Sequence, residues 1–447
     1  MVKTTFVCQE CHAQYSKWQG KCDSCASWNS IVEHKIGNNV ASYQGYATDN
    51  TLSVTSLSSI KAVDIQRIGS GFHELDRVLG GGLVSGAVML LAGHPGAGKS
   101  TLLLQLVANL ASKLKILYVT GEESSQQLAM RAKRLQINPD KIAVLTATDL
   151  DAIVQTITTN KPKLVIIDSV QVVSRQGTTG GAGGVTQIKE VAVNLSRLAK
   201  QHNIIMFLVG HVTKDNSIAG PRVLEHCVDA SLMLESLQDN RYLAIRAIKN
   251  RFGAIGELGV FGMTDKGLRE VKNPSAIFLS QHTQDTPGTI VTATWEATRA
   301  LLIELQALVT PSYAEYPKRV CVGWDSNRLA MLLAVLQKHH DINLSGHDIF
   351  INMVGGIKVE HTSADLPVVL ALLSSFKNKP LPRGLVSFGE IGLTGEIRPV
   401  SSGQARLKEA SKQGLTHAIV AKANSLKSDA IQINAVTKLA QAIAVVV

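Results

Sequence analysis

Short apolar runs alternate with amphipathic segments between about residue 63 and residue 275, and this pattern predicts alternating strands and helices. The predicted strands are 87–93, 115–123, 164–170 and 203–212. The clearest predicted helices are 100–113 and 185–202. Short apolar strands separated by helices are typical of parallel sheets that are covered on both faces. The pattern therefore predicts an α/β fold with a mostly parallel sheet.

The pattern changes on both sides of this region. A cysteine-containing segment that is poor in apolar residues comes first, and a Ser-, Thr- and Asn-rich linker follows it. After the central region, a polar stretch with two prolines leads into a second α/β region, with a helix over 327–340 and a strand–turn–helix passage over 386–413. We therefore expect this organisation: a module over 1–33, a linker over 34–62, a central domain over 63–275, a linker over 276–288 and a C-terminal domain over 289–447.

Composition limits the classes of protein that fit. The 447 residues are too many for one compact core, and 45% are hydrophobic against 18% charged. The first residues lack the apolar core of a signal peptide, and no apolar run approaches the ~20 residues of a membrane span. We expect a cytoplasmic protein without a membrane partner. The net charge of +10 favours a polyanionic partner, although a basic chain is often simply soluble.

The first predicted strand runs directly into a glycine-rich loop that fits G-x-x-x-x-G-K-[ST]. Glycines let backbone N–H groups turn around a phosphate, and the following helix adds its positive end. Lys99 would reach the β and γ phosphates of ATP, and Ser100 would hold Mg²⁺. The predicted nucleotide-binding residues are Gly93, His94, Pro95, Gly96, Ala97, Gly98, Lys99, Ser100 and Thr101.

Two further carboxylates follow apolar strands. Asp168 ends LVIID, where a second Mg²⁺ ligand is expected. Glu122 and Glu123 follow KILYVTG, and ATP hydrolysis requires a group that orients the attacking water. We prefer Glu122 for this role, but the sequence does not separate the two residues. Alternatively, both glutamates simply cap the helix that follows.

Four of the six cysteines form two CxxC pairs near the N-terminus. Cys8, Cys11, Cys22 and Cys25 can close tetrahedrally on Zn²⁺, whereas a redox site would need one CxxC beside a βαβ unit. The segment is too small to bury a core, so the metal would supply its folding energy. We predict a structural zinc site.

Together, the four-cysteine segment, GHPGAGKS, VTGEES, LVIIDS and the pentapeptide KNRFG (249–253), in this order, resemble the bacterial RadA/Sms family of DNA-repair ATPases. The resemblance covers essentially the whole chain. It implies a RecA-like ATPase core, a zinc finger and a C-terminal domain similar to the Lon protease. It also implies hexameric rings that bind single-stranded DNA and drive branch migration of recombination intermediates alongside the strand-exchange recombinase.

The resemblance assigns roles to residues outside the phosphate loop. It implies that Lys249 and Arg251, on a loop after the strand YLAIRAI, complete the ATP site of a neighbouring subunit. It places DNA contacts on two segments. Arg175 begins the first segment, 175–184, and Lys214 and Arg222 are the first and last residues of the second segment, 214–222. Because neither segment carries an aromatic residue, we expect phosphate contacts rather than base stacking. His211 resembles a sensor of the γ-phosphate, although a histidine at a strand end is more often structural.

A Lon-like domain raises the possibility of peptidase activity. Ser363 matches the nucleophile of the Ser–Lys dyad, but the lysine position falls at Gln404, which cannot act as a base, and Lys408 lies one helical turn further on. We therefore predict a domain that is inactive as a peptidase. Two alternative functions remain. One is an ATP-dependent peptidase, and the other is a RecA-fold ATP-binding switch that acts on a protein partner.

Overall fold

The computed structural model describes residues 3–8, 14–15, 17–18, 20–21, 27–28, 31–36, 66–175, 177, 183–211, 223–237, 241–279, 286–359, 361–425 and 431–446. The chain forms two compact units, residues 1–62 and residues 63–447. Among the described residues, no helix combines the length and the apolarity needed to cross a membrane.

The N-terminal unit contains a small antiparallel sheet. Its strands are β1 (Lys3–Cys8), β2 (Gln14–Tyr15) and β3 (Ile31–Ile36), with β1 in the centre. Lys21 and Trp28 form an isolated antiparallel bridge, and the Lys21 ammonium lies 5.6 Å from the centre of the Trp28 ring. Cys8 is the last residue of β1, whereas Cys11, Cys22 and Cys25 lie outside the described residues, so the zinc site stays a prediction.

The first part of the second unit is built on a nine-stranded sheet with the order β14-β13-β12-β11-β6-β10-β9-β7-β8. Six of its strands have parallel neighbours: β6 (Val88–Gly93), β7 (Ile116–Thr120), β8 (Ile142–Thr146), β9 (Leu164–Asp168), β10 (Ile205–His211) and β11 (Ala230–Leu237), which pairs with β6. The predicted central strands are therefore present, and all residues of β6, β7 and β9 are buried. This confirms the expected α/β fold.

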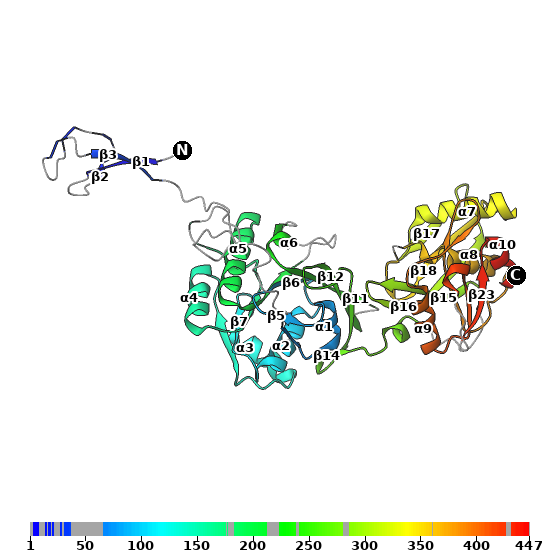
Figure 1. Ribbon diagram of the computed structural model, residues 1–447, viewed down its shortest axis with the longest axis horizontal. Coiled ribbons are helices and arrows are strands. Elements are labelled where there is room, and N and C mark those ends of the chain that lie inside the picture. Colours follow the sequence, from blue (N-terminus) through cyan, green and yellow to red (C-terminus); the bar gives the residue numbers. More distant parts are fainter. Residues whose placement is uncertain are drawn as a thin grey trace, which may run out of the picture. The chain divides into compact units, whose positions relative to one another are not determined.

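Helices cover both faces of this sheet (Figure 1). One apolar core joins the sheet to α1 (His73–Val78), α2 (Lys99–Leu110) and α3 (Ser125–Arg134). Another joins the opposite face to α4 (Leu150–Asn160), α5 (Val185–His202) and α6 (Val223–Cys227). A short pair, β4 (Arg67–Ile68) and β5 (Leu83–Val84), precedes the central strand β6.

The sheet continues beyond β11 as an antiparallel extension, of which the sequence analysis expected only the strand YLAIRAI and not its pairing. Its strands are β12 (Tyr242–Asn250), β13 (Leu258–Thr264) and β14 (Gly267–Glu270), and β12 pairs with β11. Strand β12 runs through Asn250, so Lys249 lies in a strand and not in the loop expected after YLAIRAI. Short connections without a crossover helix explain the antiparallel pairing.

The C-terminal part contains a seven-stranded mixed sheet with the order β17-β18-β16-β15-β19-β22-β23. The strands are β15 (Thr289–Glu296), β16 (Arg299–Pro311), β17 (Arg319–Val322), β18 (His347–Met353), β19 (Leu385–Phe388), β22 (His417–Ala421) and β23 (Gln432–Val436). A separate hairpin pairs β20 (Glu390–Ile391) with β21 (Ile397–Arg398). One face packs against α7 (Ser326–His340), α8 (Asp365–Phe376) and α10 (Leu439–Val446), and the other against α9 (Gly403–Lys412).

The antiparallel extension and the C-terminal part share an apolar core. Leu258 and Val260 of β13 belong to the same buried cluster as residues of β16 and α8. Phe278, within the predicted linker, is also buried there, and its carbonyl accepts a hydrogen bond of 3.0 Å from Glu304 N. At the edge of this core, Arg246 and Glu296 form an ion pair of 2.7 Å.

Candidate nucleotide site and family membership

A cavity of about 730 Å³ lies at the carboxyl ends of the parallel strands. Strands β7, β9 and β10 bring Glu122, Asp168 and His211 to it, in line with the rule that open α/β sheets bind ligands at this edge. The turn between β13 and β14 forms the opposite wall. The lining residues are Pro95, Gly96, Gly98, Lys99, Ser100, Thr101, Glu122, Glu123, Arg131, Arg134, Leu135, Asp168, His211, Met263, Thr264, Asp265 and Gly267.

The phosphate loop has the backbone that an anion cradle requires. Gly96 and Gly98 have φ values of 78° and 90°, a region that side chains other than glycine rarely adopt. Gly98 is the N-cap of α2, and no side chain caps the first backbone N–H groups of this helix. These donors are therefore available to a ligand at the positive end of the helix. The loop fits the phosphates of ATP.

Lys99 is buried beside this loop, with 5% of its surface exposed. Its ammonium donates hydrogen bonds to the carbonyl oxygens of Gly93, at 2.8 Å, and His94, at 2.9 Å. Burial lowers the pKa of Lys99, and the nearby carboxylates of Asp168 and Glu122 oppose this shift. Gly93, His94 and the buried Ala97 thus shape the loop and hold the lysine, whereas the other predicted loop residues line the cavity.

Ser100 and Asp168, the two predicted Mg²⁺ ligands, both line the cavity. The structure adds Tyr118, which the sequence analysis did not single out because it lies within an apolar strand. Its hydroxyl donates a hydrogen bond of 2.7 Å to Asp168 Oδ2. Burial, followed by the charge of Asp168, raises the pKa of Tyr118 well above its ordinary value, so the phenol remains a donor. A hydroxyl and an oriented carboxylate are ligand types that suit Mg²⁺.

The two candidate glutamates lie in different surroundings. Glu122 Oε1 is 3.0 Å from His211 Nε2 and accepts a hydrogen bond from Ser169. The bond from His211 lowers the pKa of Glu122, burial opposes this, and the bond from Ser169 lowers it further. Glu123 instead forms an ion pair of 2.6 Å with Arg131. The helix cap is neither glutamate but Ser124, which forms a capping box with Gln127.

His211 also contacts the phosphate-loop lysine. Its Nδ1 lies 3.2 Å from Lys99 Nζ. An ammonium group can only donate, so Nδ1 accepts there and Nε2 carries the proton that faces Glu122. One imidazole therefore connects the group that would hold phosphates with the carboxylate that would orient water.

Lys249 and Arg251 are not among the residues that line this cavity in the described part of the chain. The Lys249 ammonium donates hydrogen bonds to the carbonyl oxygens of Glu225 and Val228. Arg251 pairs at 3.2 Å with Asp229, which is buried and also pairs with Lys200. Lys249 and Arg251 hence lie outside the chain's own nucleotide cavity.

The glycine of KNRFG has a packing role. A Cβ at Gly253 would lie 2.6 Å from the Cα of Gly80, so the two backbones approach too closely for a side chain. Arg67 donates a hydrogen bond of 2.9 Å to the Phe252 carbonyl beside this contact. The pentapeptide thus fixes the end of β12 against the start of the ATPase region.

The predicted DNA contacts are only partly described. Arg175 forms ion pairs of 3.3 Å with Asp151 and with Glu190, and its side chain is 40% exposed. The hydrogen bond with Glu190 is the main cause that raises the pKa of Arg175. Lys214 and Arg222 lie outside the described residues, so all three DNA contacts stay predictions.

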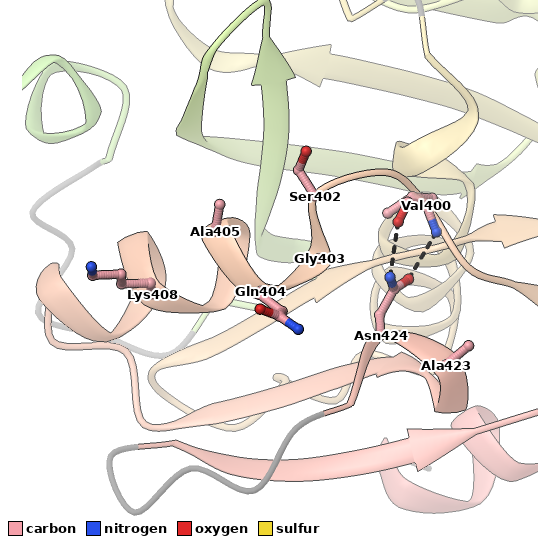
Figure 2. A pocket seen from close by; sticks show the side chains of 8 residues that line it. All are labelled: Val400, Ser402, Gly403, Gln404, Ala405, Lys408, Ala423 and Asn424. Atoms are coloured by element: carbon pink, nitrogen blue, oxygen red, sulfur yellow. Dashed lines mark hydrogen bonds between the residues drawn. The ribbon is translucent and has the colours of Figure 1, made fainter.

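The residues of the suspected peptidase dyad line two different cavities. Gln404 and Lys408 project from α9 beside a cavity of about 590 Å³ that Val400 and Asn424 also line (Figure 2). Ser363 lines another cavity, to which α9 contributes Arg406. Within the described residues, Ser363 Oγ has no hydrogen-bond partner, so no base is within hydrogen-bond distance of it.

Three family models match separate parts of the chain. A family model described as an AAA domain matches residues 55–217. Models described as the rubredoxin metal binding domain and as subunit ChlI of Mg-chelatase match residues 6–33 and 329–424. Among solved structures, a KaiC-like protein from Pyrococcus horikoshii OT3 aligns with 46% of this chain and 99% of its own, at 20% identity and a TM-score of 0.40.

Curated relatives match over nearly their whole length. The DNA repair protein RadA of Haemophilus influenzae is 51% identical, that of Pseudomonas aeruginosa 50%, and that of Escherichia coli 49%. Each alignment covers 99% of this chain and 98% of the relative. With half of the residues identical over the full length of both proteins, the chain belongs to the RadA family of DNA repair proteins.

Proposed function

We propose that this protein is an ATP-driven DNA motor of recombination and repair, which binds single-stranded DNA and promotes branch migration of recombination intermediates. The observation that carries the proposal is the position of His211. It contacts both Lys99 and Glu122, and it is the last residue of β10, directly before the segment that contains Lys214 and Arg222. A change at the nucleotide is thereby passed to a basic segment suited to a phosphate backbone.

The described residues divide the work of ATP hydrolysis. The backbone of residues 93–98 and Lys99 bind the phosphates, while Ser100 and Asp168 hold Mg²⁺, which supplies charge neutralisation at the β and γ phosphates. Glu122, kept ionised by His211 and Ser169, orients the water. In a hexameric ring, Lys249 and Arg251 of each subunit complete the neighbouring site, consistent with their place outside the chain's own cavity.

Three further parts of the proposal rest on the family and the sequence. Cys8, Cys11, Cys22 and Cys25 hold a structural Zn²⁺. The strand-exchange recombinase is the protein partner. The C-terminal domain is a platform that is inactive as a peptidase, because Gln404 occupies the position of the dyad lysine and cannot act as a base. Digestion of casein that requires ATP and is lost in Ser363→Ala would contradict this last assignment.

The test compares ATP hydrolysis with and without single-stranded DNA at two salt concentrations, and follows branch migration on a labelled three-strand intermediate. We expect DNA to stimulate hydrolysis and salt to weaken the stimulation, because phosphate contacts release counterions. Lys99→Ala is the control that separates DNA binding from hydrolysis. Hydrolysis that is indifferent to DNA, together with no shift of a labelled oligonucleotide, would overturn the motor assignment.

A further inference from the structure

The cavity that Ser363 lines has a volume of about 450 Å³, lies in the C-terminal domain and is separate from the nucleotide site. We name it the Ser363–Arg406 cavity. Its residues come from β15, the 3₁₀ turn Thr362–Ala364 with the residue before it, β20, the segment 399–401 and α9. They are Trp295, His361, Thr362, Ser363, Glu390, Pro399, Val400, Ser401 and Arg406. The volume falls within the ~300–1,000 Å³ of small-molecule sites.

Arg406 is a buried cation without an ion pair. Only 1% of its surface is exposed, and no carboxylate of the described residues lies within ion-pair distance. Its guanidinium donates to the carbonyl oxygens of Ala293 and Ser401 and lies 5.6 Å from the centre of the Phe388 ring. Burial lowers the pKa of Arg406 to about 10, and the more distant Glu296 partly opposes this. A buried charge is costly unless a counter-charge compensates it.

Ser363 supplies a second unmatched donor in the same cavity. It is 3% exposed, and its Oγ has no hydrogen-bond partner among the described residues. A buried hydroxyl without a partner lowers the stability of the folded protein. Among the other polar groups of the cavity, Thr362 Oγ1 donates a hydrogen bond of 2.7 Å to Glu390 Oε2. The cavity thus combines a buried cation without an ion pair and a buried hydroxyl without a hydrogen-bond partner, and an anionic acceptor would satisfy both.

We propose that the Ser363–Arg406 cavity binds the carboxylate group of a small ligand that carries an apolar substituent. A planar carboxylate matches the fork of an arginine side chain. Glu390, which also pairs with Arg398 at 3.6 Å, lines the same cavity, so a doubly charged phosphate meets more repulsion there than a singly charged carboxylate. Trp295, Pro399 and Val400 provide the apolar wall for the substituent. A bound carboxylate neutralises the charge of Arg406. It also accepts a hydrogen bond from Ser363 once the Ser363 side chain has rotated toward it.

Trp295 reports on occupancy of the cavity. The full chain has four tryptophans, so labelling with 5-fluorotryptophan gives few ¹⁹F resonances, and Trp295→Phe assigns the one at the cavity. The probes are N-acetyl-leucine, its uncharged amide N-acetyl-leucinamide, and inorganic phosphate. We expect N-acetyl-leucine to shift the Trp295 resonance saturably and the other two probes to leave it unchanged.

Ser363→Ala is the decisive variant, because it removes only the unmatched hydroxyl. It should weaken N-acetyl-leucine binding about tenfold or more, the effect of one hydrogen bond to a charged group. Its melting temperature should be equal or higher, and ATP hydrolysis should be unchanged, which separates this test from that of the motor. Arg406→Lys is a second variant that keeps the charge and loses the fork, and it should also weaken binding.

Three outcomes would overturn the proposal. The first is equal shifts with the acid and the amide, which would indicate an apolar pocket only. The second is a shift with phosphate alone, and the third is the absence of any shift up to millimolar N-acetyl-leucine. Unchanged affinity for N-acetyl-leucine in Ser363→Ala would likewise overturn the proposal, because the proposal assigns a hydrogen bond to this hydroxyl.

Discussion

Tyr118 donates a hydrogen bond of 2.7 Å to Asp168 Oδ2, between the neighbouring parallel strands β7 and β9. Both side chains are buried, with 0% and 7% of their surfaces exposed. The bond fixes one carboxylate oxygen of Asp168. Residues that orient metal ligands in this way contribute strongly to metal affinity, so we expect Tyr118 to be a positioning residue if Asp168 holds Mg²⁺ as proposed.

Replacing Tyr118 with phenylalanine should weaken the magnesium site while preserving the packing of β7. We expect Tyr118→Phe to raise the Mg²⁺ concentration for half-maximal ATP hydrolysis about tenfold. The measurement is a Mg²⁺ titration at fixed ATP, with recovery of the rate at high Mg²⁺ as the sign of a positioning role. A loss of maximal rate that Mg²⁺ does not restore would contradict it.

Glu122 and Glu123 form a matched pair for testing the water-orienting group. Glu122→Gln should reduce the hydrolysis rate at least about a hundredfold, the typical contribution of a positioned acid–base group, while fluorescent ATP still binds. Glu123→Gln should retain most activity, because Glu123 is paired with Arg131. Single-turnover hydrolysis and ATP binding, measured on both variants, decide between them. The reverse order of activities would assign the role to Glu123.

The pH dependence of hydrolysis should reveal the contact between His211 and Glu122. The hydrogen bond from His211 is the main cause that lowers the pKa of Glu122 below 4.5. Glu122 therefore stays ionised as the pH falls, and loses its charge only below its ordinary pKa. His211→Ala removes this cause, so the pKa of Glu122 rises and the acid limb of kcat should move to higher pH. An acid limb at the same pH would show that His211 does not control Glu122.

Mixed assemblies can show whether Lys249 acts on a neighbouring subunit. Lys99→Ala and Lys249→Ala should each lose ATP-coupled branch migration when assayed alone. Mixed together, they form some interfaces that pair an intact Lys99 with an intact Lys249 of the next subunit, so partial recovery of ATP-coupled branch migration is expected. If Lys249 acted only within its own chain, for example through its bonds to Glu225 and Val228, mixing would recover nothing.

Cys22→Ala tests the zinc site without touching the nucleotide site, because the two lie in separate compact units. We expect the variant to lose its zinc, since a structural site needs all four ligands. Basal ATP hydrolysis should persist, while work that depends on the recombinase should decline. Metal analysis of the purified variant is the measurement, and an undiminished zinc content would contradict the assignment.

Much of the nucleotide site was predictable because its parts are local in sequence. The loop 93–98 and Lys99 lie within one strand–turn–helix unit, whose spacing specifies the backbone, and Asp168 follows from an apolar strand that ends in a carboxylate. The antiparallel extension was not predictable in the same way. Whether a strand pairs in parallel or antiparallel depends on partners that are distant in the chain.

By itself, the sequence determined the class of fold, the phosphate loop and the carboxylate at the end of β9, because each depends on residues that are adjacent along the chain. Only the tertiary structure decided that Glu122 contacts His211 while Glu123 pairs with Arg131, and that Arg406 rather than Gln404 shares a cavity with Ser363. These relations depend on the angle at which each turn leaves its strand and on the face that each helix turns to the sheet. Such directions are set by the packing of the whole core and not by the spacing of residues.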